Sequence, residues 1–209
     1  MSRPEQIRFL SRTAPLYDPV VRLMGFRRLW RSMAEHAGAG PDDRCLDVCT
    51  GTGGVALAVA SGGAPVVGID VAAGMLREAD RKARASELAA KVRLVRMDAR
   101  QLAFRDASFP LVTCTMALHE MAEDERCRVL AEVRRVASAR VLFADYRVPR
   151  SRGRGLLFRA VHAFEYLESD DFVSYTSRQM DERLEAAEFR VEAHVDTGAY
   201  RIWRCRVGT

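Results

Sequence analysis

The sequence predicts an α/β fold in which helices cover both faces of a mostly parallel sheet. Short apolar runs that suit buried strands alternate with segments of helical composition along the 209 residues. One unit, at residues 45–60, joins a strand to a helix through a glycine-rich turn, and residues 191–207 suit a closing antiparallel strand pair. Alternation of this kind is typical of strands that are buried on both faces.

The expected elements begin with a helical lid over residues 1–40, where bulky apolar residues recur and Gly25 interrupts them. The stretch 38–43, with two glycines and a proline, predicts the turn into the first strand. Apolar runs place strands at 45–48, 66–70, 94–99, 111–115, 139–145, 191–195 and 200–207. Apolar residues mixed with charged ones place helices at 54–60, 73–90, 123–136, 153–168 and 177–187.

The segment Leu46–Gly54 carries the strongest functional signal, because a buried strand leads there into a turn that can bind a ligand. Gly51 and Gly53 permit a tight turn and let a ligand approach the backbone with no Cβ in the way. The helix that follows offers unpaired N–H groups and the positive end of its dipole. Asp70 ends the second strand about 20 residues later, where its carboxylate can accept hydrogen bonds from both hydroxyls of a ribose. A nucleoside ligand is therefore expected.

Two nucleoside ligands fit this unit. The pattern Gly51-x-Gly53-x-x-Ala56 matches the permissive dinucleotide fingerprint, which favours a nicotinamide or flavin enzyme. Asp47, inside the first strand, would instead repel a pyrophosphate and attract a ligand that carries an ammonium group. S-adenosylmethionine has such a group on its amino-acid tail and has no phosphate. We favour this ligand and keep an NAD(P)-dependent reductase as an alternative.

The pattern Asp47-x-Cys49-x-Gly51-x-Gly53 resembles motif I of the class I S-adenosylmethionine-dependent methyltransferases, with Cys49 where a glycine often stands. Residues 94–99 resemble the family's third strand and its terminal carboxylate, residues 102–112 the stretch before strand four, and residues 116–121 the loop over the methyl donor. The resemblance implies a Rossmann-like sheet of seven strands with an antiparallel last strand. It also implies S-adenosyl-L-methionine as cofactor and S-adenosyl-L-homocysteine as product.

A closer resemblance joins residues 9–145 to the ubiquinone/menaquinone-biosynthesis C-methyltransferases. Residues 14–18 are similar to their "A-x-x-Y-D" segment, and residues 25–30 to their "G-x-x-R-x-W" segment. The likeness ends after strand five, where Asp145-Tyr146-Arg147 stands in place of "E-F-S-x-P", and residues 146–180 have no counterpart. It implies transfer of a methyl group to a small molecule, lipophilic or quinone-like. A domain that binds the cofactor without transferring methyl groups stays an alternative.

The chain is expected to form a single methyltransferase domain over residues 1–209. It divides into the lid at 1–40, a cofactor-binding half at 41–145, and a substrate-side half with the terminal hairpin at 146–209. The predicted cofactor-binding residues come from the turn, from the ends of the next strands and from the loop after strand four. They are Asp47, Cys49, Thr50, Gly51, Thr52, Gly53, Asp70, Val71, Met75, Asp98, Ala99 and Met116.

Methyl transfer from a sulfonium is an in-line displacement that depends on alignment of the reactants and on exclusion of water. A proton leaves the nucleophile, so a base can assist. His119 is the candidate base, because it follows strand four and its unperturbed pKa of about 6.5 suits proton removal near neutrality. Tyr17 and Tyr146 are candidates to close over the donor or orient the acceptor. Each of the three can equally be a residue that shapes the pocket by packing.

Composition narrows the setting of the protein. The hydrophobic fraction is 48%, no apolar run approaches the roughly 20 residues that span a bilayer, and no secretory signal is recognised at residues 1–6. The five scattered cysteines are expected to be reduced core residues of a cytoplasmic protein. No metal is expected, because Cys45-x3-Cys49 lacks a second ligand pair.

The net charge of +5 raises the question of an anionic partner. Arginines cluster at residues 22–31 and again at residues 147–159, which suits an anionic substrate or peripheral contact with a membrane surface. A solvated, mobile loop is the plainer explanation of the second cluster. Nucleic acid is not expected, because aromatic residues are not interleaved with the basic ones.

Overall fold

The computed structural model of the protein describes residues 3–147 and 177–208. Its helices are α1 (Arg3–Leu23), α2 (Phe26–Ala37), α3 (Gly54–Ser61), α4 (Ala73–Ala85), α5 (Glu123–Val136) and α8 (Ser177–Ala186), with a short 3-10 helix η1 (Leu118–Glu120). Its strands are β1 (Cys45–Val48), β2 (Val66–Asp70), β3 (Val92–Arg96), β4 (Phe109–Thr115), β5 (Ala137–Tyr146), β6 (Phe189–Thr197) and β7 (Tyr200–Val207). The predicted helix at 153–168 lies outside the described residues.

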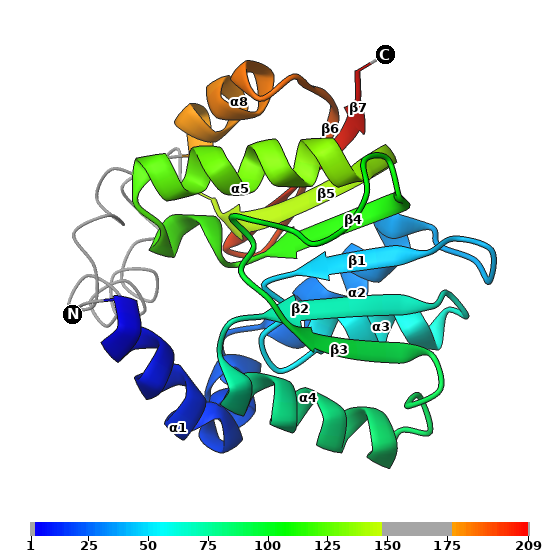
Figure 1. Ribbon diagram of the computed structural model, residues 1–209, viewed down its shortest axis with the longest axis vertical. Coiled ribbons are helices and arrows are strands. Elements are labelled where there is room, and N and C mark those ends of the chain that lie inside the picture. Colours follow the sequence, from blue (N-terminus) through cyan, green and yellow to red (C-terminus); the bar gives the residue numbers. More distant parts are fainter. Residues whose placement is uncertain (1–2, 148–176, 209) are drawn as a thin grey trace.

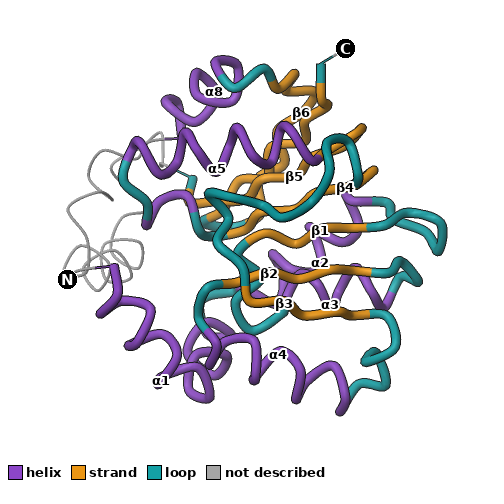
Figure 2. Tube along the Cα trace, in the orientation of Figure 1, coloured by secondary structure: helices purple, strands orange, loops and turns teal. Residues whose placement is uncertain are grey.

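The strands form one seven-stranded sheet in the order β3-β2-β1-β4-β5-β7-β6 (Figure 1). Strands β1 to β5 pair in parallel, and β7 pairs antiparallel with both β5 and β6. Helices α5 and α8 cover one face, while α2 and α3 cover the other (Figures 1 and 2). The predicted fold class, with its antiparallel last strand, is confirmed.

Each face of the sheet has its own hydrophobic core. Phe143 and Trp203 pack with α5 and α8, whereas Leu111 and Leu142 pack with α2 and α3. All four side chains are at most 2% exposed. The sheet is therefore anchored on both sides, and the carboxyl ends of its parallel strands are held at one edge.

Several predicted boundaries differ from the observed ones, most of them by one or two residues. The helix expected at 73–90 ends at Ala85, because Glu87 takes a positive φ of 57° and turns the chain back toward β3. Strand β3 consequently begins at Val92 and ends at Arg96, two residues before Asp98. Strand β5 is longer than expected, because it begins directly after α5. These shifts leave the order of the elements unchanged.

The lid consists of two helices that meet at Gly25, where φ is +86°. This left-handed conformation favours glycine and ends α1, as the interruption of the apolar pattern predicted. Helix α1 lies against α4 at the left of Figure 1, and a Cβ on Gly74 would stand only 1.9 Å from the Ser11 carbonyl oxygen. A glycine in α4 thus permits α1 to pack closely over the carboxyl edge of the sheet.

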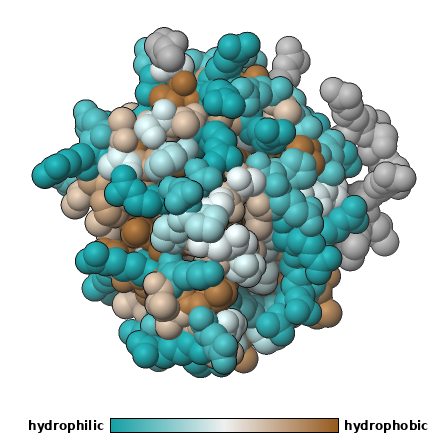
Figure 3. All heavy atoms as spheres, turned by 90° about the vertical axis from the view of Figure 1, so that its right-hand side faces the viewer, coloured by the Kyte–Doolittle hydropathy of each residue, from teal (hydrophilic) through white to brown (hydrophobic). Residues whose placement is uncertain are grey.

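None of the helices among the described residues has the length and apolar character required to cross a membrane. The face opposite α1, which Figure 3 turns to the viewer, is mostly hydrophilic and carries small, separate hydrophobic areas. Four of the five cysteines are buried or half-buried, but Cys127 is an exposed residue of α5. The expectation that all five are core residues is wrong for Cys127.

Candidate active site

A cavity of about 150 Å³ lies at the carboxyl ends of β1, β2 and β4 and is bordered by α1 and α2. The two lid helices contribute Ile7, Leu10, Tyr17, Phe26 and Trp30 to its wall. Most of the residues predicted from sequence to be functional also line it. They are Tyr17, Asp47, Cys49, Thr50, Gly51, Thr52, Asp70, Val71, Met75 and Met116.

The carboxylate of Asp47 is buried in the wall of this cavity and is 2% exposed. Its two oxygens accept hydrogen bonds from the hydroxyls of Thr50, at 2.6 Å, and Thr113, at 2.7 Å. Burial raises the pKa of Asp47 to about 6, although both hydroxyls act to lower it. No cation among the described residues pairs with it. The site therefore holds a buried carboxylate, largely ionised at neutral pH, that a ligand's ammonium group would complement.

Asp70 ties the glycine turn to the end of β2. Its Oδ2 accepts a hydrogen bond from the backbone N–H of Gly51 at 2.9 Å, and its Oδ1 accepts one from Ala72 at 2.8 Å. Burial raises the pKa of Asp70, and these backbone donors oppose the change. Each oxygen keeps a second lone pair, so the carboxylate can still accept hydrogen bonds from a bound ribose.

The glycine turn leaves room for a ligand. Gly51 has a φ of +54°, and a Cβ built on it would meet nothing within 4 Å. At Gly54, by contrast, a Cβ would stand 2.2 Å from the Trp30 ring, so this position is closed by α2. The open position faces the side from which a nucleoside would approach the turn.

Two residues without glycine's freedom adopt left-handed backbone conformations in the cavity wall. Cys49 and Met116 each have a φ of 54°, and they follow the neighbouring strands β1 and β4. Such conformations are strained for residues with a side chain and concentrate at functional sites. The positive φ of Cys49 also explains why a glycine often stands at this point of motif I in the family it resembles.

Five predicted site residues lie outside the cavity wall. Gly53, Ala99, His119 and Tyr146 do not line it, and neither does Asp98. The Asp98 carboxylate instead accepts hydrogen bonds from the Arg100 guanidinium, at distances down to 2.6 Å. The predicted contact of Asp98 with the adenine amino group stays a prediction, and this ion pair competes with it.

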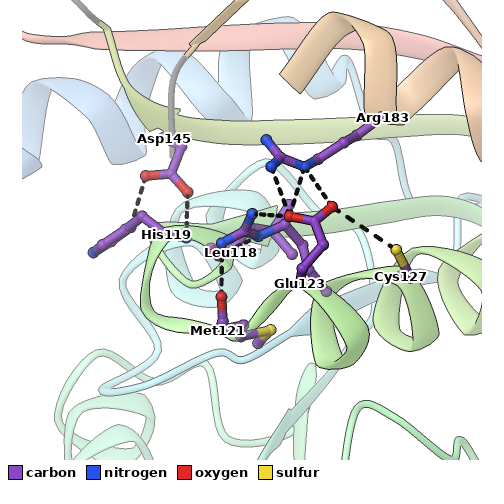
Figure 4. Close-up of polar contacts among 8 residues, drawn as sticks. Leu118, His119, Met121, Glu123, Cys127, Asp145 and Arg183 are labelled. Carbon is purple, nitrogen blue, oxygen red and sulfur yellow. Dashed lines mark hydrogen bonds and ion pairs between the residues drawn. The ribbon is translucent and has the colours of Figure 1, made fainter. Parts of the chain in front are cut away.

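His119 and Asp145 form a buried pair beside the cavity, at the ends of β4 and β5 (Figure 4). The Nδ1 atom of His119 lies 2.7 Å from Oδ1 of Asp145, and the His119 backbone N–H donates to Oδ2 at 3.2 Å. The Tyr146 backbone N–H also donates to this carboxylate, at 2.8 Å. Asp145 thereby fixes the orientation of the imidazole, and the sequence analysis did not identify it as a site residue.

The loop that carries His119 is held by a buried arginine. Arg126 is 0% exposed, and its guanidinium donates to the carbonyl oxygens of Leu118 and Met121 at 2.9 and 2.6 Å. A third hydrogen bond, 2.8 Å long, reaches Glu123 (Figure 4). A charged group without exposure is stable here because each of these acceptors compensates its lost hydration.

A polar contact fastens the lid to the glycine turn. Asp18 of α1 is 5% exposed and accepts hydrogen bonds from Thr52 Oγ1 and from Lys82 Nζ, both at 2.5 Å. The Lys82 ammonium also lies 5.6 Å from the centre of the Trp30 ring. Burial lowers the pKa of Lys82, and Asp18 opposes the change. The lid, the turn and α4 therefore meet at one buried ion pair.

The cavity wall includes residues that the sequence analysis did not select. Ile7, Leu10, Phe26 and Trp30 come from the lid, and Glu120 and Met121 come from the loop after β4. A signal for the lid residues existed, because positions 7, 10 and 17 fall on one face of a helix. The sequence did not show where this face of the helix packs, because its position depends on contacts of Gly74 and Asp18 with other segments.

Comparison with known proteins gives consistent results. A methyltransferase-domain family model matches residues 45–139. Demethylmenaquinone methyltransferase of Thermus thermophilus is 36% identical over 156 residues, covering 71% of this chain and 69% of that protein. Ubiquinone/menaquinone biosynthesis C-methyltransferase UbiE of Geotalea uraniireducens is 31% identical over 166 residues, covering 74% and 67%. The matches span about two thirds of the length of these relatives.

A solved structure shares the fold. Magnesium protoporphyrin IX methyltransferase of Synechocystis PCC 6803, solved with bound SAH, superposes with a TM-score of 0.70 at 18% identity. The match covers 88% of this chain and 84% of that one.

Proposed function

Since the chain belongs to the class I S-adenosylmethionine-dependent methyltransferases, near the ubiquinone/menaquinone-biosynthesis C-methyltransferases, we propose that it methylates a small, lipophilic, quinone-like acceptor. One observation carries the methyl-donor part of this proposal. Two carboxylates, Asp47 and Asp70, meet at the wall of a single cavity at the carboxyl ends of β1 and β2. A buried anion suits an ammonium group, and an anion with spare lone pairs suits a ribose.

S-adenosylmethionine is the cofactor, and when bound it supplies an electrophilic methyl group on a sulfonium. We assign its amino-acid tail to Asp47 and its ribose to Asp70, with the open backbone of Gly51 alongside. Val71 and Met75 offer apolar surface to the adenine ring of the cofactor. Thr50 and Thr113 hold the Asp47 carboxylate in place through their hydroxyls. The folded chain therefore holds these donor-binding groups in position before the donor binds.

His119 is proposed as the base that removes a proton from the acceptor. With the imidazole proton on Nδ1, directed at Oδ1 of Asp145, Nε2 is left as the basic atom. Nε2 lies 3.8 Å from Oε1 of Glu120, and Glu120 belongs to the cavity wall. The basic nitrogen thus lies near a residue of the cavity wall, while His119 itself stands beside the cavity. Asp145 acts as a positioning residue through His119.

Two observations support a lipophilic acceptor. The lid side of the cavity is apolar, since Ile7, Leu10, Phe26 and Trp30 line it. In addition, the relatives described above are named for demethylmenaquinone and for ubiquinone and menaquinone. Tyr17 also lines the lid side, and we assign to it the orientation of an acceptor ring. A cytoplasmic location remains part of this proposal.

The proposal is tested by methyl transfer from labelled S-adenosylmethionine to reduced short-chain naphthoquinones and benzoquinones. We expect labelled product with the wild-type chain and at least 100-fold less with His119→Gln. His36→Gln is a matched control, because His36 lies on α2 away from the cavity wall and bonds only within its own helix turn. Cofactor binding without transfer to any quinol would instead favour a non-transferring domain. Tight NADH binding without any binding of S-adenosylhomocysteine would favour a reductase.

A further inference from the structure

The outward face of α1 carries an apolar line that the fold does not explain. Among the described residues, the large hydrophobic side chains that are exposed are Phe9, Leu16 and Leu23, at 43%, 68% and 92%. All three belong to α1, and they are spaced seven residues apart. Seven residues are close to two helical turns, so the three side chains form one line along the helix.

This line is separate from the face by which α1 packs. The packing face follows positions 7, 10, 14, 17 and 21, of which Ala14 and Val21 are buried while Ile7, Leu10 and Tyr17 line the cavity. At 100° per residue the two lines lie about 140° apart on the helix. A helix that only covered the site would need the inner line alone, and single exposed leucines elsewhere would need no explanation. Three exposed apolar side chains in one line on a single helix do need an explanation.

Positive charge surrounds the outer line. Arg12 lies between Phe9 and Leu16 on the same face, and Arg8 and Arg22 each precede a residue of the line. Along residues 6–34 the only acid is Asp18, which is buried against Lys82. The exposed arginines of the lid form no ion pair within the described residues. They are Arg8, Arg12, Arg22, Arg27, Arg28 and Arg31.

We infer that this face of α1 docks on an anionic phospholipid surface. Apolar side chains that enter the headgroup region, with arginines beside them, are the features of interfacial helices. Arginine stems can also lie along the apolar boundary while their guanidinium groups bind phosphate. A second copy of the chain suits the face poorly, because a twofold contact would bring the same arginines against each other.

Docking places the lid between the lipid surface and the site. The inner face of α1 lines the cavity of about 150 Å³, which is smaller than the roughly 300–1,000 Å³ of typical ligand pockets, so outward movement of this helix would enlarge the space for a ligand. A helix held at the lipid surface would open toward the phase in which a lipophilic acceptor dissolves. This consequence rests on the proposed function, whereas the docking itself does not.

The test is co-sedimentation of the full chain with vesicles of phosphatidylcholine containing about one third phosphatidylglycerol. We expect binding that is at least 10-fold weaker on pure phosphatidylcholine and that falls in 0.5 M salt. Leu16→Ser/Leu23→Ser should reduce binding at least 10-fold, and Arg8→Glu/Arg12→Glu should do the same. Arg93→Glu/Arg190→Glu is the matched control, because it makes the same charge change at exposed positions on β3 and β6.

Absence of vesicle binding overturns the inference, as does an equal loss in the control pair. Loss of a dimer in the Leu16→Ser/Leu23→Ser variant, without a change in vesicle binding, would assign the face to self-association and would also overturn it. Affinity for S-adenosylhomocysteine is measured in the same samples. A chain that binds this ligand but no vesicles contradicts only the docking, and the converse contradicts only the proposed function.

Discussion

The two sides of the cavity are built in different ways. On the cofactor side, Asp47, Gly51 and Asp70 lie within 24 residues and are joined by the turn itself, with Asp70 bonded to the Gly51 N–H. On the acceptor side that we propose, His119 lies beside the cavity and contacts Asp145, 26 residues away at the end of another strand. The first side is tied together through a backbone N–H of the glycine turn, and the second through a side-chain pair at the ends of β4 and β5. Substitutions should therefore separate cofactor binding from catalysis.

The largest expected effect lies on the acceptor side. His119→Gln should lower kcat by about 10²- to 10⁴-fold, the usual contribution of a general base, while the affinity for S-adenosylhomocysteine changes less than threefold. Asp145→Asn should lower kcat less, because an amide oxygen can still contact Nδ1 but orients the imidazole less firmly. A parallel loss of cofactor affinity in both variants would show that the two sides are not separable.

The next effect lies on the cofactor side at Asp47. Asp47→Asn should weaken S-adenosylhomocysteine binding by about 30- to 100-fold at pH 7.5, a loss typical of a buried charge-assisted contact. In the wild type the affinity should fall as the pH drops below about 6, since protonation removes the anion that attracts the ammonium group. Calorimetric titration across pH 5–8 checks both results. An affinity that is flat in pH, and equal in the variant, would contradict the assignment.

The Asp47 carboxylate should also lower the free energy of unfolding near neutral pH. Its pKa is about 6 when folded and 3.8 ordinarily, so folding takes up a proton between these values. Its contribution to stability is therefore full below pH 3.8 and is lost as the pH rises through 6, by roughly 3 kcal/mol from a shift of this size. Urea unfolding of Asp47→Asn should show a flatter pH dependence over pH 4–7 than the wild type. An identical pH dependence in the two proteins would refute the raised pKa.

A smaller effect is expected at Asp18, where α1 meets the glycine turn and α4. Asp18→Asn removes the anion shared by Thr52 and Lys82, so α1 should open more readily. We expect about 10-fold faster amide hydrogen exchange in residues 3–23 and faster release of S-adenosylhomocysteine. Asp80→Asn is the matched control, because Asp80 pairs only with Arg84 on the exposed face of α4. Unchanged exchange in Asp18→Asn would show that the ion pair does not hold the lid.

The smallest effect concerns Cys49. Because its φ is 54°, Cys49→Gly relieves backbone strain while losing the packing of a small side chain, and unfolding free energy should change by less than about 1 kcal/mol. Cys49→Val places a β-branched side chain in the same conformation and should cost about 2 kcal/mol or more. Equal stabilities of the two variants in urea would contradict the left-handed backbone at this position.

The sequence predicted the local half of the molecule well. The strand at 45–48 and the helix at 123–136 appear with the predicted bounds, because apolar period and composition agree there. The position of the glycine turn and Asp70 at the cavity wall was predictable, because it follows from their spacing along the chain. Asp145, Arg126 and the inner face of α1 were not, since their roles arise from contacts between distant segments. Asp98 shows a different limit, because it pairs with Arg100 only two residues away and the family pattern does not include this ion pair.

The most direct measurement is a calorimetric titration of the wild type and of Asp70→Ala with S-adenosylhomocysteine, with Asp80→Ala as a surface control. The account predicts one-site binding by the wild type and the control, and an affinity at least 100-fold lower for Asp70→Ala in protein whose thermal unfolding stays cooperative. Equal affinity of all three, or tight binding of NADH in place of S-adenosylhomocysteine, would contradict it.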